Sequence, residues 1–259
     1  MKKVAYMAIS RWQLLSPINA VIFDCDGTLS AIEGIDELAK NKGVEKLVNR
    51  LTAEAMGKTG LNPALYQKRL DLVQPHKDEV LALGQHYFNH RIANVISVIQ
   101  ILQRLNKKVY IISAGLYPAV AIFGDMLQVP RENIFAVNIQ FDLQGNYFSF
   151  DRESPLVNLG GKRVIVSQLK ALHPDILYIG DALNDYEIYD LATRFVGFGG
   201  AFYRENIASR CQYYITASSM DPLLPLALTQ VEYDSLTSVE QALYHHGLTT
   251  IYEGEVIIR

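Results

Sequence analysis

Two aspartates stand one residue apart, directly after a short apolar run, in the stretch VIFDCDGTLS at residues 21–30. The run at 21–23 is β-branched and aromatic, which predicts a short buried strand. A carboxylate at the end of such a strand is costly to desolvate unless a cation or a hydrogen-bond donor pairs with it. Asp24 and Asp26 therefore constrain the fold, because other parts of the chain must bring a partner to this strand end.

The apolar segments of the chain alternate between strand-like and helix-like patterns. Four short runs predict strands, at 20–23, 109–112, 176–179 and 195–198. Apolar residues recur at helical spacing between them, at Val164, Ile165, Leu169 and Leu172 and again at Leu183, Ile188 and Leu191. This alternation is typical of a parallel sheet with helices on both faces. We expect an α/β fold with a Rossmann-like, doubly wound parallel sheet.

A long stretch after the first strand, from about 35 to 105, has amphipathic helical patterns and no convincing strand. One helix ends near Gly43 and a second follows it. A third begins at Asn62-Pro63, with Asn as the N-cap and Pro as the first helical residue. A fourth includes Val80, Leu81 and Leu83. These four segments predict a helical bundle.

The predicted elements divide the chain into a core and an insert. We expect an α/β core at 1–31 and 93–259, with a C-terminal extension from about 222, and a helical-bundle cap at 32–92. Such an insert, beside the carboxyl end of a strand, is well placed to cover a site there. The segment FDLQGNYFSF at 141–150 predicts a hairpin, because Gln-Gly-Asn stands between aromatic flanks.

Polar residues in four separate stretches would meet at one edge of this sheet. They are Asp24 to Thr28, Ser113-Ala114-Gly115, Gly160-Gly161-Lys162 and Gly180 to Asp185. The stretches at 24–28, 113–115 and 180–185 directly follow a predicted strand. The stretch at 160–162 opens a helix. Ligands bind at the carboxyl ends of parallel strands, so we expect these side chains to converge.

The residue types indicate phosphoryl chemistry. Clustered carboxylates need a cation, and oxygen ligands without clustered His or Cys favour Mg²⁺ over zinc. Ser113, nearby backbone N–H groups and Lys162 suit phosphate oxygens. One aspartate can attack phosphorus and form an aspartyl-phosphate, while the second protonates the leaving alcohol. We therefore expect a Mg²⁺-dependent phosphomonoesterase acting on a small molecule.

The four stretches resemble the haloacid-dehalogenase-like phosphatase superfamily. Within it, the cap resembles that of the phosphoserine phosphatases, in EGIDELAKNKGVEKLVNRLTAEAMG and in QKRLDLVQP at 67–75. VGFGG at 196–200, Arg204 and YYIT at 213–216 are similar as well. The resemblance covers roughly residues 20–220, and it implies hydrolysis of O-phosphoserine to serine and phosphate.

The resemblance also implies a role for each matching residue. Asp24 would be the nucleophile and a metal ligand, and Asp26 the acid/base with its backbone carbonyl on the metal. Asp181 would complete the protein ligands with support from Asp185. Ser113, Ala114, Gly115 and Lys162 would hold the phosphoryl group. In the cap, Glu33 would take the substrate ammonium and Arg69 its carboxylate, Met56 and Gly57 would line the cap, and Asn184 and Arg204 would lie on the substrate side.

Two departures from the family pattern leave the substrate open. Ala114 stands where the family usually has Gly, and Asn62-Pro63 stands where an aromatic residue is common. The alternatives are a phosphatase for another small phosphorylated amine or acid, or a non-catalytic module that binds a phospho-ligand. A dehalogenase would share the fold and the nucleophile, but it needs neither a metal nor a second acid.

Each of these residues also has an ordinary structural interpretation. Asp24 and Asp26 can form a turn with a helix cap, and Ser113 can cap the following helix. Lys162 and the cap charges can be solvated, Met56 can be core, Asn184 can brace its turn and Arg204 can pair with a nearby acid. The joint occurrence of all four stretches favours the catalytic interpretation.

Composition excludes several other classes of function. The chain has 259 residues and a net charge of −3, and no basic block indicates nucleic-acid binding. Its apolar runs are too short to span a membrane. The cysteines, Cys25 and Cys211, make no disulfide framework, and no signal-peptide pattern is clear, so a reducing, cytoplasmic location is expected. The sequence leaves a homodimer open.

Overall fold

The computed structural model describes residues 12–55 and 60–259. Within that part of the chain, the main sheet has seven strands in the order β3-β2-β1-β6-β7-β8-β9. Neighbouring strands are parallel except for β8 and β9. The strands are β1 (Ala20–Phe23), β2 (Lys108–Leu116), β3 (Ile134–Val137), β6 (Ile176–Gly180), β7 (Arg194–Phe198), β8 (Tyr213–Ile215) and β9 (Val256–Ile258). The four predicted strands and the doubly wound α/β fold are confirmed.

Strand β1 lies in the middle of the sheet and places the paired aspartates. All four of its residues are buried, as expected for a parallel strand covered on both faces. Phe23 pairs with Ile111 of β2 and with Ile179 of β6. The residues that follow Phe23 therefore lie beside the carboxyl ends of both neighbours.

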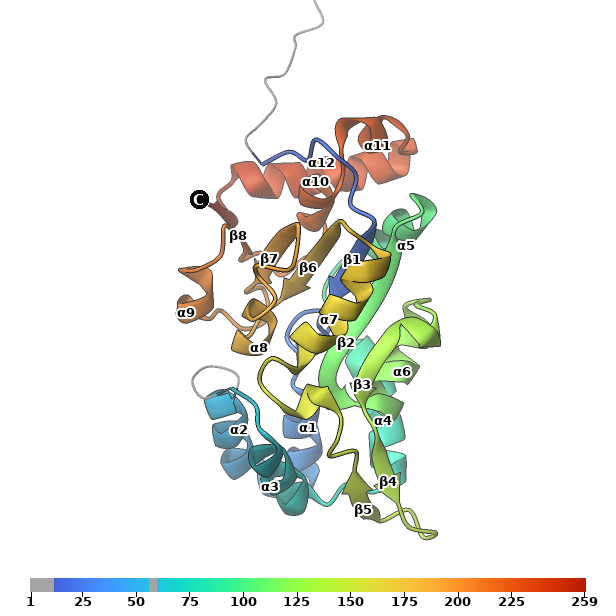
Figure 1. Cartoon of the computed structure of the whole chain (residues 1–259), viewed down its shortest axis with the longest axis vertical. Coiled ribbons are helices and arrows are strands. Elements are labelled where there is room, and N and C mark those ends of the chain that lie inside the picture. Colours follow the sequence, from blue (N-terminus) through green and yellow to red (C-terminus); the bar gives the residue numbers. More distant parts are fainter. Residues whose placement is uncertain (1–11, 56–59) are drawn as a thin grey trace, which may run out of the picture.

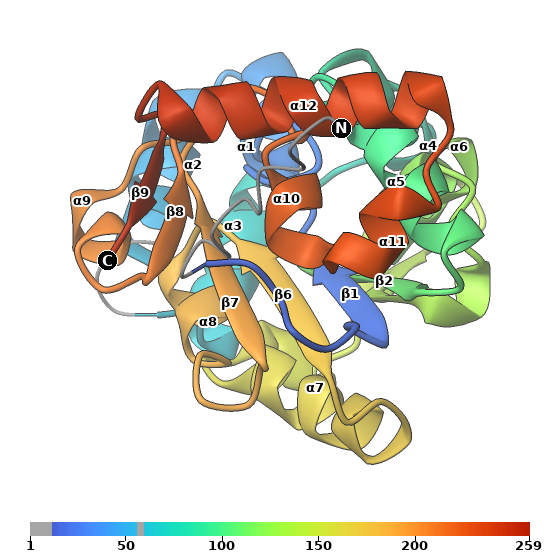
Figure 2. The same cartoon turned by 90° about the horizontal axis from the view of Figure 1, so that it is seen from above.

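Helices cover both faces of the sheet. The core helices include α5 (Val95–Arg104), α6 (Tyr117–Met126), α7 (Gly161–Leu172), α8 (Leu183–Tyr186) and α9 (Glu205–Ala208). The C-terminal extension adds α10 (Leu223–Ala227), α11 (Gln230–Asp234) and α12 (Ser238–Tyr252). Helices α7 and α12 lie on opposite faces of the sheet (Figure 2).

The predicted cap helices are present at the end of the sheet opposite to α10–α12 (Figure 1). They are α1 (Gly34–Asn41), α2 (Glu45–Glu54), α3 (Pro63–Val73) and α4 (Lys77–Asn89). Asn62 caps α3 as predicted, because its Oδ1 accepts the Leu65 N–H at 2.9 Å. Helix α4 packs along α6 of the core, which fixes the last cap helix to the sheet.

The hairpin predicted at 141–150 is also present, as β4 (Ile139–Phe141) and β5 (Tyr147–Phe150) in antiparallel pairing. It contacts the cap, because the rings of Tyr66 in α3 and Phe150 in β5 lie 4.9 Å apart between centroids. The side of the molecule that holds the cap thus includes residues from beyond 92, and the boundaries of 32–92 stay a prediction.

Two of the ordinary structural interpretations and one helix prediction are wrong. Strand β2 continues past Ile112 to Leu116, with a shift in its pairing to β3, so Ser113 lies in the strand and the N-cap of α6 is Leu116. Lys162 is buried in α7 and not solvated. The helix expected to reach Leu191 is the single turn α8, followed by hydrogen-bonded turns. No described helix combines the length and the apolar character that a membrane span requires.

A buried ion pair joins the C-terminal extension to the core. The Nζ atom of Lys107 donates to the carbonyl oxygen of Ile18 at 2.9 Å and to Oε1 of Glu232, in α11, at 2.5 Å. The Lys107 side chain is 1% exposed. Removing one partner of a buried ion pair destabilises the folded protein, because the other charge stays in an environment that solvates it poorly.

We predict that Lys107→Met lowers the free energy of unfolding by about 3 kcal/mol, because it removes the cation beside the Glu232 carboxylate and the donor to the Ile18 carbonyl. The matched control is Arg104→Met, which removes a pair with Glu240 whose cation is 41% exposed. The control should cost less than about 1 kcal/mol. Urea unfolding measures both values, and equal losses would contradict the role given to Lys107.

Candidate active site

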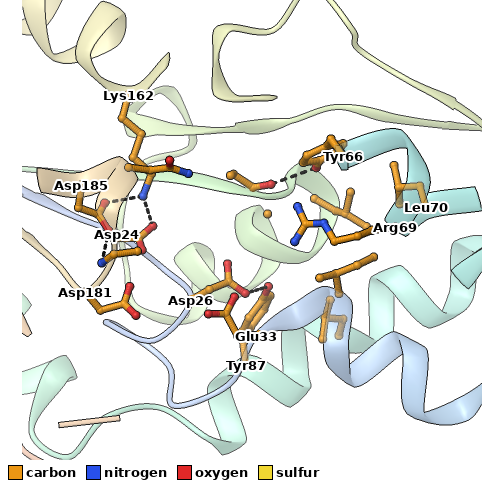
Figure 3. A pocket seen from close by; sticks show the side chains of 17 residues that line it. Asp24, Asp26, Glu33, Tyr66, Arg69, Leu70, Tyr87, Lys162, Asp181 and Asp185 are labelled. Atoms are coloured by element: carbon orange, nitrogen blue, oxygen red, sulfur yellow. Dashed lines mark hydrogen bonds and ion pairs between the residues drawn. The ribbon is translucent and has the colours of Figure 1, made fainter. Parts of the chain in front are cut away.

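A pocket lies where the carboxyl edge of the sheet faces the cap (Figure 3). Sheet-edge residues and cap residues line it together. From the core come Asp24, Asp26, Ala114, Gly115, Leu116, Lys162, Asp181, Ala182, Asn184 and Asp185, and from the cap come Glu33, Ile35, Tyr66, Arg69, Leu70, Leu83 and Tyr87. The structure thus brings most of the predicted site residues into one cavity.

Three aspartates cluster at the floor of this pocket. Among the described residues, carboxylate oxygens of Asp24, Asp181 and Asp185 lie within 4.8 Å of one another, and all three residues are buried. Burial raises the pKa of Asp24 well above its usual value, and the charge of Asp185 adds to this effect against the opposing effect of Lys162. Burial likewise raises the pKa of Asp181 to about 6, although Arg204 opposes it.

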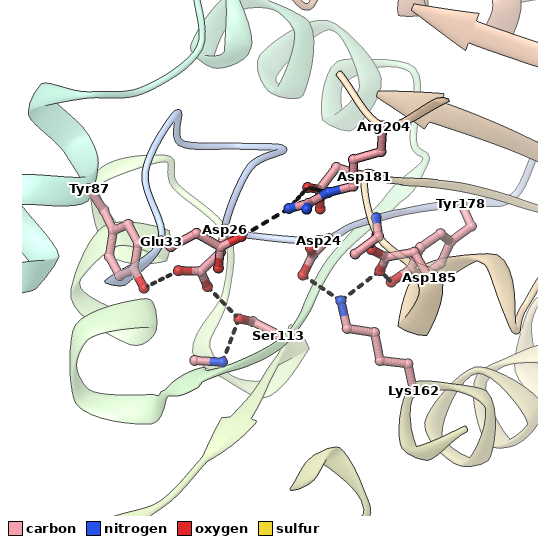
Figure 4. Close-up of polar contacts among 12 residues, drawn as sticks. Asp24, Asp26, Glu33, Tyr87, Ser113, Lys162, Tyr178, Asp181, Asp185 and Arg204 are labelled. Atoms are coloured by element: carbon pink, nitrogen blue, oxygen red, sulfur yellow. Dashed lines mark hydrogen bonds and ion pairs between the residues drawn. The ribbon is translucent and has the colours of Figure 1, made fainter. Parts of the chain in front are cut away.

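Lys162 joins two of these carboxylates. Its Nζ lies 2.5 Å from Oδ1 of Asp24 and 2.6 Å from Oδ1 of Asp185 (Figure 4). Burial by itself would lower the pKa of Lys162, but the two carboxylates outweigh it and raise that pKa. Lys162 therefore stays charged where it can contact both a buried carboxylate and an anionic ligand.

Asp185 is fixed by its own hydrogen bonds. Its Oδ1 accepts the hydroxyl of Tyr178 at 2.6 Å as well as Lys162, and its Oδ2 accepts the Ala182 N–H at 3.0 Å. A side chain at Gly180 would collide with this carboxylate, so the glycine is required there. Asp185 therefore supports the cluster from behind, while Asp24 and Asp181 have more freedom to bind a ligand.

The donor set fits a divalent cation. The cluster offers carboxylate oxygens without His or Cys ligands, and such sets favour hard cations. Five carboxylates line the described part of the pocket beside the cations Lys162 and Arg69: Asp24, Asp26, Glu33, Asp181 and Asp185. Burial raises the pKa of Asp24, Glu33 and Asp181, and a bound divalent cation would favour their ionised forms.

The side chain of Asp26 points away from the three clustered carboxylates. Its Oδ1 accepts the N–H of Gly34 at 2.6 Å and the hydroxyl of Tyr87 at 2.7 Å. Its Oδ2 accepts the Ser113 hydroxyl at 3.2 Å, and Ser113 Oγ in turn accepts the Gly115 N–H at 2.8 Å. Asp24 and Asp26 thus stand in different environments, although one residue separates them.

The two predicted cap charges both reach the pocket. Arg69 is 4% exposed, and its Nε has no hydrogen-bond partner among residues 12–55 and 60–259. Its Nη1 contacts Thr52 Oγ1 at 3.4 Å, and its guanidinium lies 5.4 Å from the ring centroid of Tyr66. Burial raises the pKa of Glu33, with Asp26 and Asp181 adding to the effect.

Arg204 and Asn184 have structural partners as well as pocket positions. Arg204 donates from Nε to Asp181 Oδ2 at 3.1 Å, and its Nη2 lies 3.2 Å from Oε1 of Glu33. The interpretation that Arg204 pairs with a nearby acid is therefore confirmed. Asn184 Oδ1 accepts the Leu61 N–H at 3.5 Å, which links the sheet edge to the cap. Met56 and Gly57, predicted to line the cap, lie outside the described residues.

Three tyrosines were missing from the predicted site. Tyr66 packs in the pocket wall and donates to the Ala114 carbonyl at 3.0 Å, so it supplies an aromatic wall four residues after Asn62. Tyr87 bonds Asp26, and Tyr178 bonds Asp185. Only Tyr66 has a local signal, because it precedes Arg69 by three residues on the same helix.

Comparison with known proteins identifies the family. No protein-family model matches the chain. The phosphoserine phosphatase of Bos taurus is 35% identical over 205 residues, which cover 78% of this chain and 91% of that protein. The Homo sapiens phosphoserine phosphatase is 35% identical over 206 residues, covering 79% and 92%. The chain belongs to the phosphoserine phosphatase family. The resemblance drawn from the sequence motifs is thereby confirmed.

Solved structures agree with this membership of the phosphoserine phosphatase family. A phosphoserine phosphohydrolase-like protein from Francisella tularensis has a TM-score of 0.70 at 25% identity, covering 77% of this chain and 96% of that one. A structure titled as a phospho-aspartyl intermediate analogue of phosphoserine phosphatase has a TM-score of 0.69 at 21% identity, covering 79% and 96%. At 21% identity, the similarity to the second structure shows that the two proteins share a fold.

We predict that Mg²⁺ raises the thermal unfolding midpoint, because an ion that binds the folded site stabilises it by about 2.7 kcal/mol at a hundred times its Kd. Asp181→Asn should abolish the rise, since it removes one of the clustered carboxylates. The control, Asp190→Asn, changes a surface carboxylate that is 67% exposed and should keep the rise. A rise that survives Asp181→Asn would place the ion elsewhere.

Proposed function

We propose that this protein is a Mg²⁺-dependent phosphatase that hydrolyses O-phosphoserine to serine and phosphate through an aspartyl-phosphate. The observation that carries the substrate assignment is Arg69, a buried guanidinium that points into the pocket (Figure 3) with its Nε unpaired within the described chain. A buried donor without a partner is costly, and a substrate carboxylate would satisfy it. The names of the relatives support the same substrate.

Asp24 and Asp26 would divide the chemistry between them. The Asp24 carboxylate attacks phosphorus, the bond from phosphorus to the serine oxygen breaks, and Asp26 gives its proton to that oxygen. Asp26, now a carboxylate, then takes a proton from a water whose oxygen attacks phosphorus. The bond to Asp24 breaks, phosphate leaves and both aspartates return to their starting state. The different environments of the two carboxylates support these different roles.

The phosphoryl group would be held by residues at the sheet edge. Lys162 supplies a fixed positive charge beside Asp24. The Ser113 hydroxyl, once it turns away from Asp26, and the Ala114 N–H would donate to phosphoryl oxygens. Gly115 would lie beside them, with its N–H held by Ser113 Oγ. Mg²⁺, bound by Asp24, the Asp26 backbone carbonyl and Asp181 with support from Asp185, would supply further neutralisation of the phosphoryl charge when present.

The cap would recognise the amino-acid part of the substrate. Arg69 binds the carboxylate and Glu33 the ammonium, because each is largely buried and has the opposite charge to its ligand. Arg204, paired with Glu33, and Asn184 complete the substrate side. That Met56 and Gly57 line the cap stays a prediction from the sequence.

We extend the proposal to the setting of the reaction. Release of serine suits a role in amino-acid biosynthesis, specifically serine biosynthesis. A cytoplasmic location suits the two cysteines, because Cys25 and Cys211 are both free and buried in the described chain. A homodimer stays a prediction from the sequence.

Asp24→Asn should reduce phosphate release from phosphoserine with Mg²⁺ to the background rate, because the amide cannot accept the phosphoryl group. The unfolding midpoint should change little, since the amide oxygen still accepts the Lys162 hydrogen bond. Asp142→Asn, at the tip of the β4–β5 hairpin, is the control and should keep full activity. Near-full turnover by Asp24→Asn would show that the nucleophile is another residue.

Arg69→Met should lower kcat/KM for phosphoserine about tenfold to a hundredfold, because hydrogen bonds to charged groups contribute about 1.5–3 kcal/mol. Turnover of phosphoethanolamine, which has no carboxylate, should not change. The neighbouring Lys68→Met, at an exposed position of the same helix, controls for loss of charge. If the wild type hydrolyses phosphoethanolamine as well as phosphoserine, the substrate is another small phosphorylated amine.

A further inference from the structure

Tyr87 lies deep between the cap and the core without belonging to any motif of the sequence. It occupies the last turn of α4 and is 1% exposed. Its ring stacks on Phe123 of α6, with centroids 5.7 Å apart and planes inclined by 20°. Gly34 makes room for it, because a Cβ at position 34 would collide with the Tyr87 hydroxyl. Packing from both sides therefore fixes where this hydroxyl lies.

The Tyr87 hydroxyl makes the two oxygens of Asp26 unequal (Figure 4). Oδ1 accepts two short hydrogen bonds, from Tyr87 at 2.7 Å and from the Gly34 N–H at 2.6 Å. Oδ2 accepts the Ser113 hydroxyl at 3.2 Å, a bond that Ser113 can exchange by rotating its hydroxyl. A proton on Oδ1 would be repelled by the donor hydrogens of Tyr87 and Gly34. A proton on Oδ2 is tolerated, because the Ser113 hydroxyl can rotate its own hydrogen away.

We propose that Tyr87 is a positioning residue that reserves Oδ2 of Asp26 for the transferred proton and aims that oxygen at the leaving group. The inference rests on the proposed function, because it assigns Tyr87 a part in the acid/base step. Two fixed donors on Oδ1 prevent the carboxyl group from rotating. The proton therefore moves from Oδ2 to the serine oxygen as the bond from phosphorus to that oxygen breaks.

The surroundings of Tyr87 hold its hydroxyl as a donor to Asp26. The phenol has a single hydroxyl proton, and it donates that proton to Oδ1 of Asp26 at 2.7 Å. Helix α4, which carries Tyr87, is fixed in two ways. A capping box at His76 closes its N-terminus, and the helix packs against α6.

The test uses two substrates that differ in their need for a proton. Serine leaves phosphoserine as an alkoxide unless an acid protonates its oxygen, whereas p-nitrophenyl phosphate releases a stable p-nitrophenolate anion without an acid. Tyr87→Phe keeps the stacked ring and removes the hydroxyl. Its kcat/KM for phosphoserine should fall on the order of tenfold, a part of the hundredfold or more that a general acid contributes. Its kcat/KM for p-nitrophenyl phosphate should stay within about twofold of the wild type.

Two further variants separate positioning from a structural effect. Tyr178→Phe removes the hydroxyl on Asp185 and should lower kcat/KM for both substrates alike, since that residue supports the shared phosphoryl site. Tyr110→Phe removes a hydroxyl that bonds His173 and should change kcat/KM for neither substrate.

A double mutant tests whether Tyr87 acts through Asp26. In an Asp26→Asn background, Tyr87→Phe should have no further effect, because the carboxyl group on which it acts is already absent. The unfolding midpoint of Tyr87→Phe shows whether the fold is kept.

The outcomes also separate this inference from the proposed function. A wild type that hydrolyses neither substrate overturns the proposed function. A wild type that is active, together with Tyr87→Phe losing equal activity on both substrates or none, overturns the role of Tyr87 alone. A further loss in the Asp26→Asn background would likewise show that Tyr87 acts by another route.

Discussion

Three buried carboxylates converge near the ammonium group of Lys162, and the rest of the molecule is arranged around that convergence. Isolated charges at this depth would be strongly unfavourable, so each must meet a partner of opposite charge or a donor. The parallel sheet meets this demand, because β1 and β6 end side by side and deliver Asp24, Asp181 and Asp185 to one point. Helix α7 begins opposite them and directs Lys162 inward. A side chain at Gly161 would collide with the Pro155 carbonyl, so this close approach depends on glycine.

The core and the cap have different proposed roles, and hydrogen bonds connect them. In the proposed account, the sheet edge handles the phosphoryl group and the cap reads the amino-acid part of the substrate. Three cap residues also contact the sheet edge directly: Tyr66 at the Ala114 carbonyl, Leu61 at Asn184 and Tyr87 at Asp26. The geometry of Asp26 therefore depends on the position of the cap. In the proposed mechanism this dependence would couple substrate recognition to the proton transfer.

How far the sequence predicted this arrangement depends on the range of the interactions involved. The apolar run before Asp24, the Asn62-Pro63 helix start and the hairpin centre are local signals, and the structure confirms all three elements. The end of β2 was predicted too early, because polar Ser113 interrupts the apolar run although the strand continues. Strands β3 and β8 are short and gave no clear pattern.

Contacts between distant residues were beyond sequence reasoning. Tyr87 and Asp26 are 61 residues apart, and Lys107 and Glu232 are 125 apart, so no periodicity links either pair. The motifs identified the residues of the acidic cluster, but not the tyrosines that orient them. Tertiary packing decides which of the many tyrosines contacts a carboxylate, and no short sequence segment indicates that packing.

A divalent cation shared by Asp24, which follows β1, and Asp181, which follows β6, is the interaction on which the proposed chemistry depends. Crystals soaked in Mn²⁺, measured for anomalous scattering at the manganese edge, test it most directly. We expect a single strong peak between the carboxylates of Asp24 and Asp181, close to the backbone carbonyl of Asp26. A peak elsewhere with nothing between these two carboxylates would contradict it.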